Sequence, residues 1–130
     1  MTTGSAPSEL VYIAPVFRVA DLERSIEFYR DGIGFAVEFV HAGFYASLRR
    51  DGARLHLNCG TPFPRDDAAV RRAEHIDACV VVANAAACLA RVEAAGILPS
   101  VPLRTMPYGT EFYVRDPDGY VLGFLEPARD

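Results

Sequence analysis

The chain of 130 residues is 51% hydrophobic and 23% charged, values typical of a folded globular domain and not of a disordered chain. All 13 basic residues are arginines, yet the net charge is −4 and no basic stripe is present, which argues against nucleic acid as a partner. The apolar runs are far shorter than the roughly 18 residues that a membrane span needs, so no membrane partner is expected.

The start of the chain and its cysteines favour a cytoplasmic protein. Residues 1–10 lack the positive start and apolar core of an export signal and are expected to be a frayed leader. The three cysteines, Cys59, Cys79 and Cys88, are odd in number and lie in apolar or helical runs. Buried, reduced thiols suit this pattern better than a disulfide framework.

Residues 11–59 are predicted to form a first βαβββ module. A strand over Tyr12–Val19 leads into a helix over Leu22–Asp31, in which Asp21 caps the first free amides and glycines end the last turn. Leu22, Ile26 and Tyr29 recur at helical spacing and are expected to face a sheet. The remaining strands are predicted near Ala36–Val40, Gly43–Arg49 and Arg54–Asn58.

Residues 60–74, rich in proline and charge, are interpreted as a linker to a second module over residues 75–127. That module repeats the first: a strand over His75–Val82, a helix that Asn84 caps and Gly96 closes, and three more strands. These strands are predicted near Leu98–Leu103, Glu111–Arg115 and Tyr120–Leu125.

An Asp-Gly turn joins the last two strands of each half, in RRDGARLHL at residues 49–57 and in RDPDGY at residues 115–120. Because the turns occupy equivalent places, the chain is interpreted as a duplicated unit. The predicted fold class is α+β: two βαβββ modules form a curved mixed sheet, shaped as a cup, with helices on its outer face.

Alternation along the strands predicts one apolar and one polar face. The apolar residues, expected to face the helices, are Phe44, Ala46, Leu48, Leu55, Leu57, Phe112, Val114, Leu122 and Phe124. The polar face carries Tyr45, Ser47, Arg49, Arg54, His56, Asn58, Glu111, Tyr113 and Arg115, with His75, Asp77 and Cys79 on the strand after the linker. The functional site is expected in this polar concavity.

Two segments carry a family resemblance, FRVADLERSIEFYRDGIGF at residues 17–35 and YGTEFYVRDPDGYVLGFLEP at residues 108–127. With the element order, they resemble the vicinal oxygen chelate superfamily, which includes glyoxalase I, extradiol dioxygenases, and fosfomycin and bleomycin resistance proteins. The resemblance covers residues 10–127. It implies the fold described above, and this fold hosts both enzymes and binders.

The resemblance implies that an enzyme of this superfamily would hold a divalent metal through one residue at each of four strand positions. Those positions fall at Ala14, His56, Asp77 and Gly123, with His75 as an alternative to Asp77. Alanine and glycine offer no ligand, and two side chains rarely hold a metal where three or four are usual. We therefore expect no metal and no other cofactor, with His56, His75 and Asp77 as the only candidate ligands.

Loss of the ligands points to the bleomycin resistance branch, which sequesters its antibiotic without chemistry. Ala14-Pro15, residues 37–51 and the YGTEF motif at residues 108–112 resemble that branch. Tyr108 and Thr110 replace the branch's Trp and Arg, so the resemblance implies a ligand other than bleomycin. The predicted ligand-binding residues are Phe39, Tyr45, Tyr108 and Tyr113 as aromatic walls, with Arg49, Arg54, His56, Asp77 and Glu111 as polar contacts.

Three hypotheses for function follow from these residues. The first is a metal-free binder of a small aromatic or antibiotic-like molecule. The second is a metal-dependent lyase or dioxygenase that uses His56 with Asp77 or His75. The third is a cofactor-free enzyme with His56 or Tyr113 as general acid or base. A homodimer is expected in each case, because Pro15 suits an edge or crossing strand and the resemblance implies pockets completed between two copies.

Overall fold

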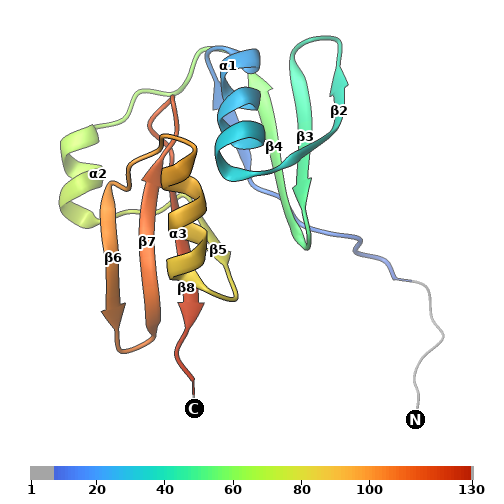
Figure 1. Ribbon diagram of the computed structural model, residues 1–130. Helices are drawn as coiled ribbons and strands as arrows, with labels where there is room; N and C mark the ends of the chain where they lie inside the picture. The colour runs from blue at the N-terminus through green and yellow to red at the C-terminus, as the bar shows by residue number, and fades with distance from the viewer. Residues whose placement is uncertain (1–7, 130) are drawn as a thin grey trace.

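The computed structural model describes residues 8–129, which form two βαβββ modules, each with its own four-stranded sheet (Figure 1). The predicted α+β class and the duplicated module are confirmed. Residues 1–7 of the expected leader lie outside the described part of the chain. Within residues 8–129, no helix has both the length and the apolar character to cross a membrane.

The first module has the strand order β1-β4-β3-β2, with β1 parallel to β4 and the other neighbours antiparallel. A π-helical segment, η1, continues helix α1, so the expected single helix over Leu22–Asp31 has two parts. The elements are β1 (Val16–Val19), α1 (Leu22–Glu27), η1 (Phe28–Ile33), β2 (Ala36–His41), β3 (Tyr45–Arg50) and β4 (Ala53–Cys59).

The second module has the equivalent order β5-β8-β7-β6, again with one parallel pair, between β5 and β8. The Asp-Gly turns join β3 to β4 and β7 to β8, which are equivalent places in the two modules, as predicted. Its elements are β5 (Ala78–Val81), α3 (Ala85–Ala94), β6 (Val101–Met106), β7 (Gly109–Arg115) and β8 (Val121–Pro127).

Each module helix starts at a side-chain cap and buries one face on its sheet (Figure 1). Asp21 Oδ1 accepts from the Arg24 amide at 3.1 Å, and Asn84 Oδ1 accepts from the Ala87 amide at 2.9 Å. η1 ends at Gly34, whose φ of 96° is a left-handed conformation that favours glycine. The caps were predictable, but the widening of the helix at Phe28 was not.

Several predicted strand boundaries are wrong, and in three strands the error is three residues or more. β1 begins at Val16 and not at Tyr12, because Pro15 has no amide hydrogen for the ladder and contributes only its carbonyl, which accepts from the His56 amide at 3.0 Å. β5 begins at Ala78 and not at His75, because the chain must first turn back from the preceding helix through Glu74, which has a φ of 50°. β6 extends to Met106, three residues past the predicted end.

The predicted linker contains a helix, α2 (Asp67–Ala73), that the sequence analysis missed. The Asp66 side chain caps it, accepting from the Ala69 amide at 3.1 Å. Its seven residues bury no side chain fully, so it has no strong apolar stripe to indicate a helix in the sequence.

The buried core follows the predicted apolar faces with one exception. Ala46, Leu48 and Leu57 are fully buried beneath the helices, as are Phe112 and Val114 in the second module. The prediction for Phe44 is wrong: it precedes β3, is 46% exposed, and packs edge-on against the His41 ring. The left-handed residues at the β2–β3 turn direct its side chain away from the core.

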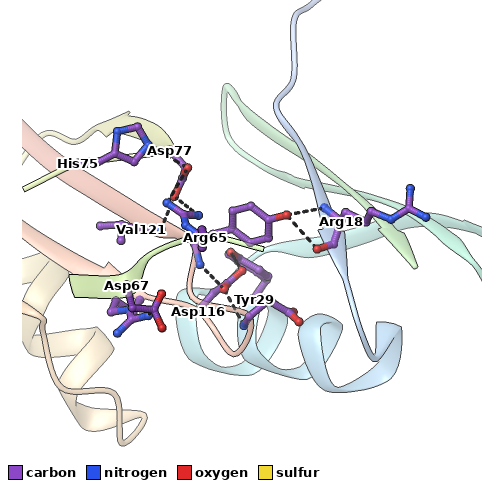
Figure 2. Close-up of polar contacts among 11 residues, drawn as sticks. Arg18, Tyr29, Arg65, Asp67, His75, Asp77, Asp116 and Val121 are labelled. Atoms are coloured by element: carbon purple, nitrogen blue, oxygen red, sulfur yellow. Dashed lines mark hydrogen bonds and ion pairs between the residues drawn. The ribbon is translucent and has the colours of Figure 1, made fainter. Parts of the chain in front are cut away.

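The turn RDPDGY of the second module binds α1 and η1 of the first module through two aspartates, of which Figure 2 shows Asp116 with Tyr29. The Tyr29 hydroxyl donates to Asp116 Oδ2 at 2.7 Å, while Asp116 Oδ1 accepts from the Asp118 and Tyr120 amides, both at 2.9 Å. Asp118 accepts from the Ala20 amide at 3.0 Å and from the Ser25 hydroxyl at 3.3 Å. The turn therefore joins the modules through one buried hydrogen bond, from Tyr29 to Asp116, and through more exposed ones to Asp118.

Tyr120 completes this connection on the other side of the turn. Its hydroxyl donates to the Arg18 carbonyl at 2.9 Å and accepts from the Arg18 amide at 3.1 Å, and its ring stacks on Phe17 at 4.3 Å between centroids. A strand of the first module is thus bonded to a turn more than 100 residues away along the chain.

Burial raises the pKa of the Asp116 carboxyl above its ordinary value, and the hydrogen bond from Tyr29 opposes that shift. Burial also raises the pKa of Tyr29 well above its ordinary value, followed by the effect of the Asp116 charge. Tyr29 therefore stays protonated and acts as the donor in this pair.

The substitution Tyr29→Phe is expected to lower the free energy of unfolding by about 1–3 kcal/mol near neutral pH, because one buried carboxylate oxygen loses its donor. It also removes the bond that lowers the pKa of Asp116. The difference from the wild type should therefore shrink as pH falls through the raised folded-state pKa of Asp116, since a protonated carboxyl needs the donor less.

Urea unfolding across this pH range measures both effects. Tyr108→Phe is the matched control, because it removes a tyrosine–carboxylate bond of the same 2.7 Å length from a side chain that is half exposed. A cost for Tyr29→Phe that is no larger than that of the control, or that grows as pH falls, contradicts the proposed role of the pair.

Candidate functional site

His56, on β4, lies between two tyrosine hydroxyls on the face of the first sheet away from the helices. Its Nδ1 is 2.8 Å from the Tyr45 hydroxyl, and its Nε2 is 2.9 Å from the Tyr12 hydroxyl. Both rings meet the imidazole edge-on, with centroids 5.4 and 5.8 Å away. A neutral imidazole has one donor and one acceptor nitrogen, so the two hydroxyls satisfy it fully.

Arg54, from the same strand, covers the Tyr12 ring, with its guanidinium carbon 4.4 Å from the ring centroid. Glu38 holds the guanidinium in place through both carboxylate oxygens, at 3.1 and 3.3 Å. The same Glu38 accepts from the hydroxyl of the buried Ser47 at 2.9 Å. The cation is therefore fixed in position over an aromatic ring and is not free to swing into solvent.

The corresponding face of the second sheet centres on Glu111 of β7, which is buried. Arg104 Nε donates to Glu111 Oε2 at 2.8 Å, and the Tyr108 hydroxyl donates to the same oxygen at 2.7 Å. Arg104 also binds Glu74 at 2.9 Å and lies over the Tyr113 ring at 5.4 Å. Most of the polar groups on this face are therefore already paired with one another.

Two phenols on this second face have raised pKa values. The hydrogen bond to Glu111 is the main cause for Tyr108, and burial is the main cause for Tyr113. Both hydroxyls stay protonated near neutral pH. A small cavity of about 240 Å³ separates Tyr113 from Val70 of α2 and from Val121.

Asp77, named as a candidate metal ligand and as a polar contact for the ligand, belongs to a cluster separate from His56 (Figure 2). It accepts from Arg65 at 3.1 Å, from the Val121 amide at 2.8 Å, and lies 3.1 Å from His75 Nε2. His56 and Asp77 do not bond to each other: His56 bonds to tyrosines on the first sheet, and Asp77 bonds to Arg65 of the linker and to the Val121 amide of the second sheet.

The donor set does not fit the divalent metal that the fold family's enzymes hold. Neither ring nitrogen of His56 is free, and Asp77 is bound to Arg65. A side chain at Gly123 would meet Ile76 and Tyr113 within 3.2–3.4 Å, so this position is also crowded. Among residues 8–129, no group of three or more His, Cys, Asp or Glu side chains converges.

Glu126, the one carboxylate just beyond the expected ligand position on β8, has a structural partner. Its Oε1 accepts from the Ala85 amide at 2.9 Å at the start of α3. This contact supplies an acceptor for a free amide in the first turn of the helix.

A large cleft, about 1090 Å³, does not coincide with either polar face. It lies between the modules and is lined mainly by apolar residues, among them Phe35, Leu55, Val80 and Phe124. Of the nine predicted ligand-binding residues, only Arg54 and Asp77 reach it. We favour the polar face of the first sheet as the site, because His56 and Arg54 are held there beside aromatic rings. The cleft also has charged residues, but Arg50, Asp77 and Arg91 are bonded to the protein's own backbone or side chains.

The predicted ligand-binding residues therefore fall into separate places. Tyr45, Arg54 and His56 come together on the first sheet, with Phe39 and Arg49 exposed on the neighbouring strands. Tyr108, Glu111 and Tyr113 come together on the second sheet. Asp77 stands apart from both groups.

Three important residues were missed. Tyr12 contacts His56, and Glu38 contacts Arg54. In the sequence, the only sign of these contacts is position: in an extended chain Tyr12 lies on the same side as Ala14, and Glu38 on the same side as Val40. Arg104 lies past the predicted end of its strand, and the bulge between Val101 and Arg104 shifts the register there.

The family model described as the glyoxalase/bleomycin resistance protein/dioxygenase superfamily matches residues 10–124. No curated protein matches the sequence. Solved structures share the fold at low identity. A bleomycin-binding protein from bleomycin-producing Streptomyces verticillus, complexed with copper(II)-bleomycin, is 22% identical with a TM-score of 0.69, and the match covers 94% of this chain and 100% of that one.

Two further structures show a similar match. TnmS3, an antibiotic-binding protein from Streptomyces sp. CB03234, is 21% identical with a TM-score of 0.67, covering 91% of this chain and 98% of that one. A glyoxalase-related enzyme from Clostridium phytofermentans is 16% identical with a TM-score of 0.72, and the match covers 95% of this chain and 98% of that one. At these identities the likeness establishes a common fold and not a common activity.

Proposed function

Because the chain belongs to the glyoxalase/bleomycin resistance protein/dioxygenase superfamily, we propose that it binds a small aromatic or antibiotic-like molecule, without a catalytic metal and as a homodimer. The observation that carries this proposal is the polar face of the first sheet, where His56 and Arg54 are fixed beside aromatic rings. A rigid cation, an imidazole and aromatic walls suit an aromatic ligand with polar substituents.

The arrangement of donors supports binding over metal chemistry. Each enzyme class of the superfamily needs several ligands around one ion, and here Ala14 and Gly123 stand at two of the four positions. The other two, His56 and Asp77, are engaged with different partners. This set gives the metal-dependent lyase or dioxygenase less support than the binder.

Acid–base catalysis without a cofactor has less support than binding. Burial raises the pKa of Tyr113, so this phenol is a poor base near neutral pH. Among residues 8–129, His56 bonds to two hydroxyls and to no carboxylate, so the usual partner of a catalytic histidine is missing from this part of the chain.

The similar structures support the ligand class by analogy only. Two of them are described as binding bleomycin or an antibiotic, while a third is described as a glyoxalase-related enzyme. The ligand-binding comparison agrees with the chemistry of the first sheet's face, and the enzyme comparison is why metal content is tested below.

The exposed apolar segment before β1 supports the homodimer. Leu10, Val11 and Ile13 are 89%, 84% and 93% exposed, and Ile13 borders the large apolar cleft between the modules. β5 forms one edge of its sheet, and its Val81 is also exposed and borders the cleft. A soluble protein rarely leaves such a surface open, and a second copy of the chain is the occupant we propose.

A ligand that binds the first sheet's face is expected to raise the unfolding temperature of the wild type but not of His56→Ala. At a concentration 100-fold above Kd, binding adds about 2.7 kcal/mol to the free energy of unfolding. A thermal-shift screen of aromatic natural products measures it. His41→Ala is the matched control, because His41 lies at the end of β2 with its ring against Phe44. A screen without any stabilising compound, or equal loss in both variants, contradicts the proposal.

Protein purified without chelator is expected to contain zinc, nickel, iron and manganese each at well below one ion per chain. The reason is that the available donors do not converge on one point. Elemental analysis by mass spectrometry, calibrated against protein concentration, provides the measurement. One stoichiometric transition metal that disappears in His56→Ala would refute the metal-free assignment and favour the enzyme hypothesis.

In solution the protein is expected to have twice the chain mass of 14.2 kDa. Ile13→Asp should shift it toward the monomer, because a charge would be placed in the apolar contact. Light scattering after size exclusion measures the mass. Leu98→Asp is the control, since Leu98 is 80% exposed but lies on the second module outside the cleft. A monomeric wild type, or a dimer indifferent to Ile13→Asp, excludes this interface.

A further inference from the structure

Tyr12 lies on the first sheet's face in the way that a bound ligand would. Its hydroxyl meets His56 Nε2 at 2.9 Å, and the Arg54 guanidinium covers its ring at 4.4 Å. One polar contact and one cation–π contact thus recognise the two chemical features of a phenol, the hydroxyl and the electron-rich ring. Each contact comes from a β4 residue 42 to 44 positions away in sequence.

The groups that hold Tyr12 are themselves fixed by other residues. Glu38 makes two bonds: it holds Arg54 at 3.1 Å, and it accepts from the hydroxyl of the buried Ser47 at 2.9 Å. Tyr45 holds the other nitrogen of His56 at 2.8 Å. These supports do not involve Tyr12, so the recognition geometry would remain if Tyr12 left.

The segment that carries Tyr12 is weakly attached. Tyr12 is 44% exposed, while its neighbours Val11 and Ile13 are almost wholly exposed. Within residues 8–129, no backbone hydrogen bond holds Ser8–Ala14; the first is the one from His56 to the Pro15 carbonyl. Within a single chain, Tyr12 is therefore the main hydrogen-bonded attachment of this segment to the sheet, and an equivalent group from outside could replace its side chain.

We propose that the His56–Arg54 pair forms a subsite for a phenol, and that Tyr12 occupies it until a ligand with a hydroxylated aromatic ring displaces it. This inference rests on the proposed function, because it names the chemical class that the same face binds. Tyr12 competes with ligands for the His56–Arg54 pair. A ring without a hydroxyl cannot replace the bond between Tyr12 and His56, so it should displace Tyr12 less readily than a phenol does. Only the Tyr12 side chain has to leave His56 and Arg54, so its release leaves the neighbouring Ile13 free to keep the proposed dimer contact.

The test is to replace the Tyr12 side chain with the free molecule that it resembles, p-cresol. In the full chain with Tyr12→Ala, p-cresol should bind saturably, with a Kd about tenfold or more below that for the wild type. Toluene, which lacks the hydroxyl, should bind Tyr12→Ala about fivefold or more weakly than p-cresol does. Adding Arg54→Ala or His56→Ala to Tyr12→Ala should each weaken p-cresol binding several-fold. Titration followed by nuclear magnetic resonance measures these constants.

Phe44→Ala is the matched control: Phe44 is an aromatic residue of the same module with nearly equal exposure, 46%, and it touches neither His56 nor Arg54. It should leave p-cresol affinity at the wild-type level. Tyr12→Phe, which keeps the ring and loses only the hydroxyl, should raise p-cresol affinity by a smaller factor and serves if Tyr12→Ala folds poorly.

Equal p-cresol affinity in Tyr12→Ala and the wild type, or toluene binding as tightly as p-cresol, would overturn the phenol subsite. Such a result leaves the broader binding function standing if the thermal-shift screen finds a ligand. A wild type that no aromatic compound stabilises, combined with tight p-cresol binding to Tyr12→Ala, would instead remove the proposed function and keep the subsite.

Discussion

The buried bond between the Tyr29 hydroxyl and the Asp116 carboxylate is the interaction on which the arrangement of the molecule depends. It joins a helix of the first module to a turn of the second, and the same carboxylate holds the Asp118 and Tyr120 amides. A buried carboxylate is costly unless donors surround it. The turn can therefore take only the position in which these donors meet it, and this position sets how the two sheets lie relative to each other.

The two modules share one architecture, but the polar faces of their sheets differ. On the second sheet, Arg104 is neutralised by Glu111 and Glu74, and Tyr108 is bonded to the same carboxylate. On the first sheet, His56 and Arg54 keep contacts with Tyr12, the one group there that belongs to a loosely held segment. The binding site that we propose therefore lies on the first sheet, where a ligand could take over the contacts of Tyr12.

Much of the candidate site could be anticipated from alternation alone. Tyr45 and His56 fall on the same face of adjacent antiparallel strands. In the observed register Ser47 lies opposite His56, so Tyr45, two residues away from Ser47, is a diagonal neighbour of His56. The predicted association of His56 with Asp77 failed because alternation says which face a residue occupies but not which of two sheets it belongs to. Arg104 was missed because a bulge changed the register of an edge strand, and a bulge leaves little trace in one sequence.

The sequence by itself determined the duplicated βαβββ order, the helix caps at Asp21 and Asn84, and the apolar faces, because these depend on residues close together along the chain. Only the tertiary structure decided that the chain forms two sheets, that Asp116 binds Tyr29, and that Tyr12 lies under Arg54. Those pairings join residues 42 to 87 positions apart, and no local preference selects among the many partners available at such separations.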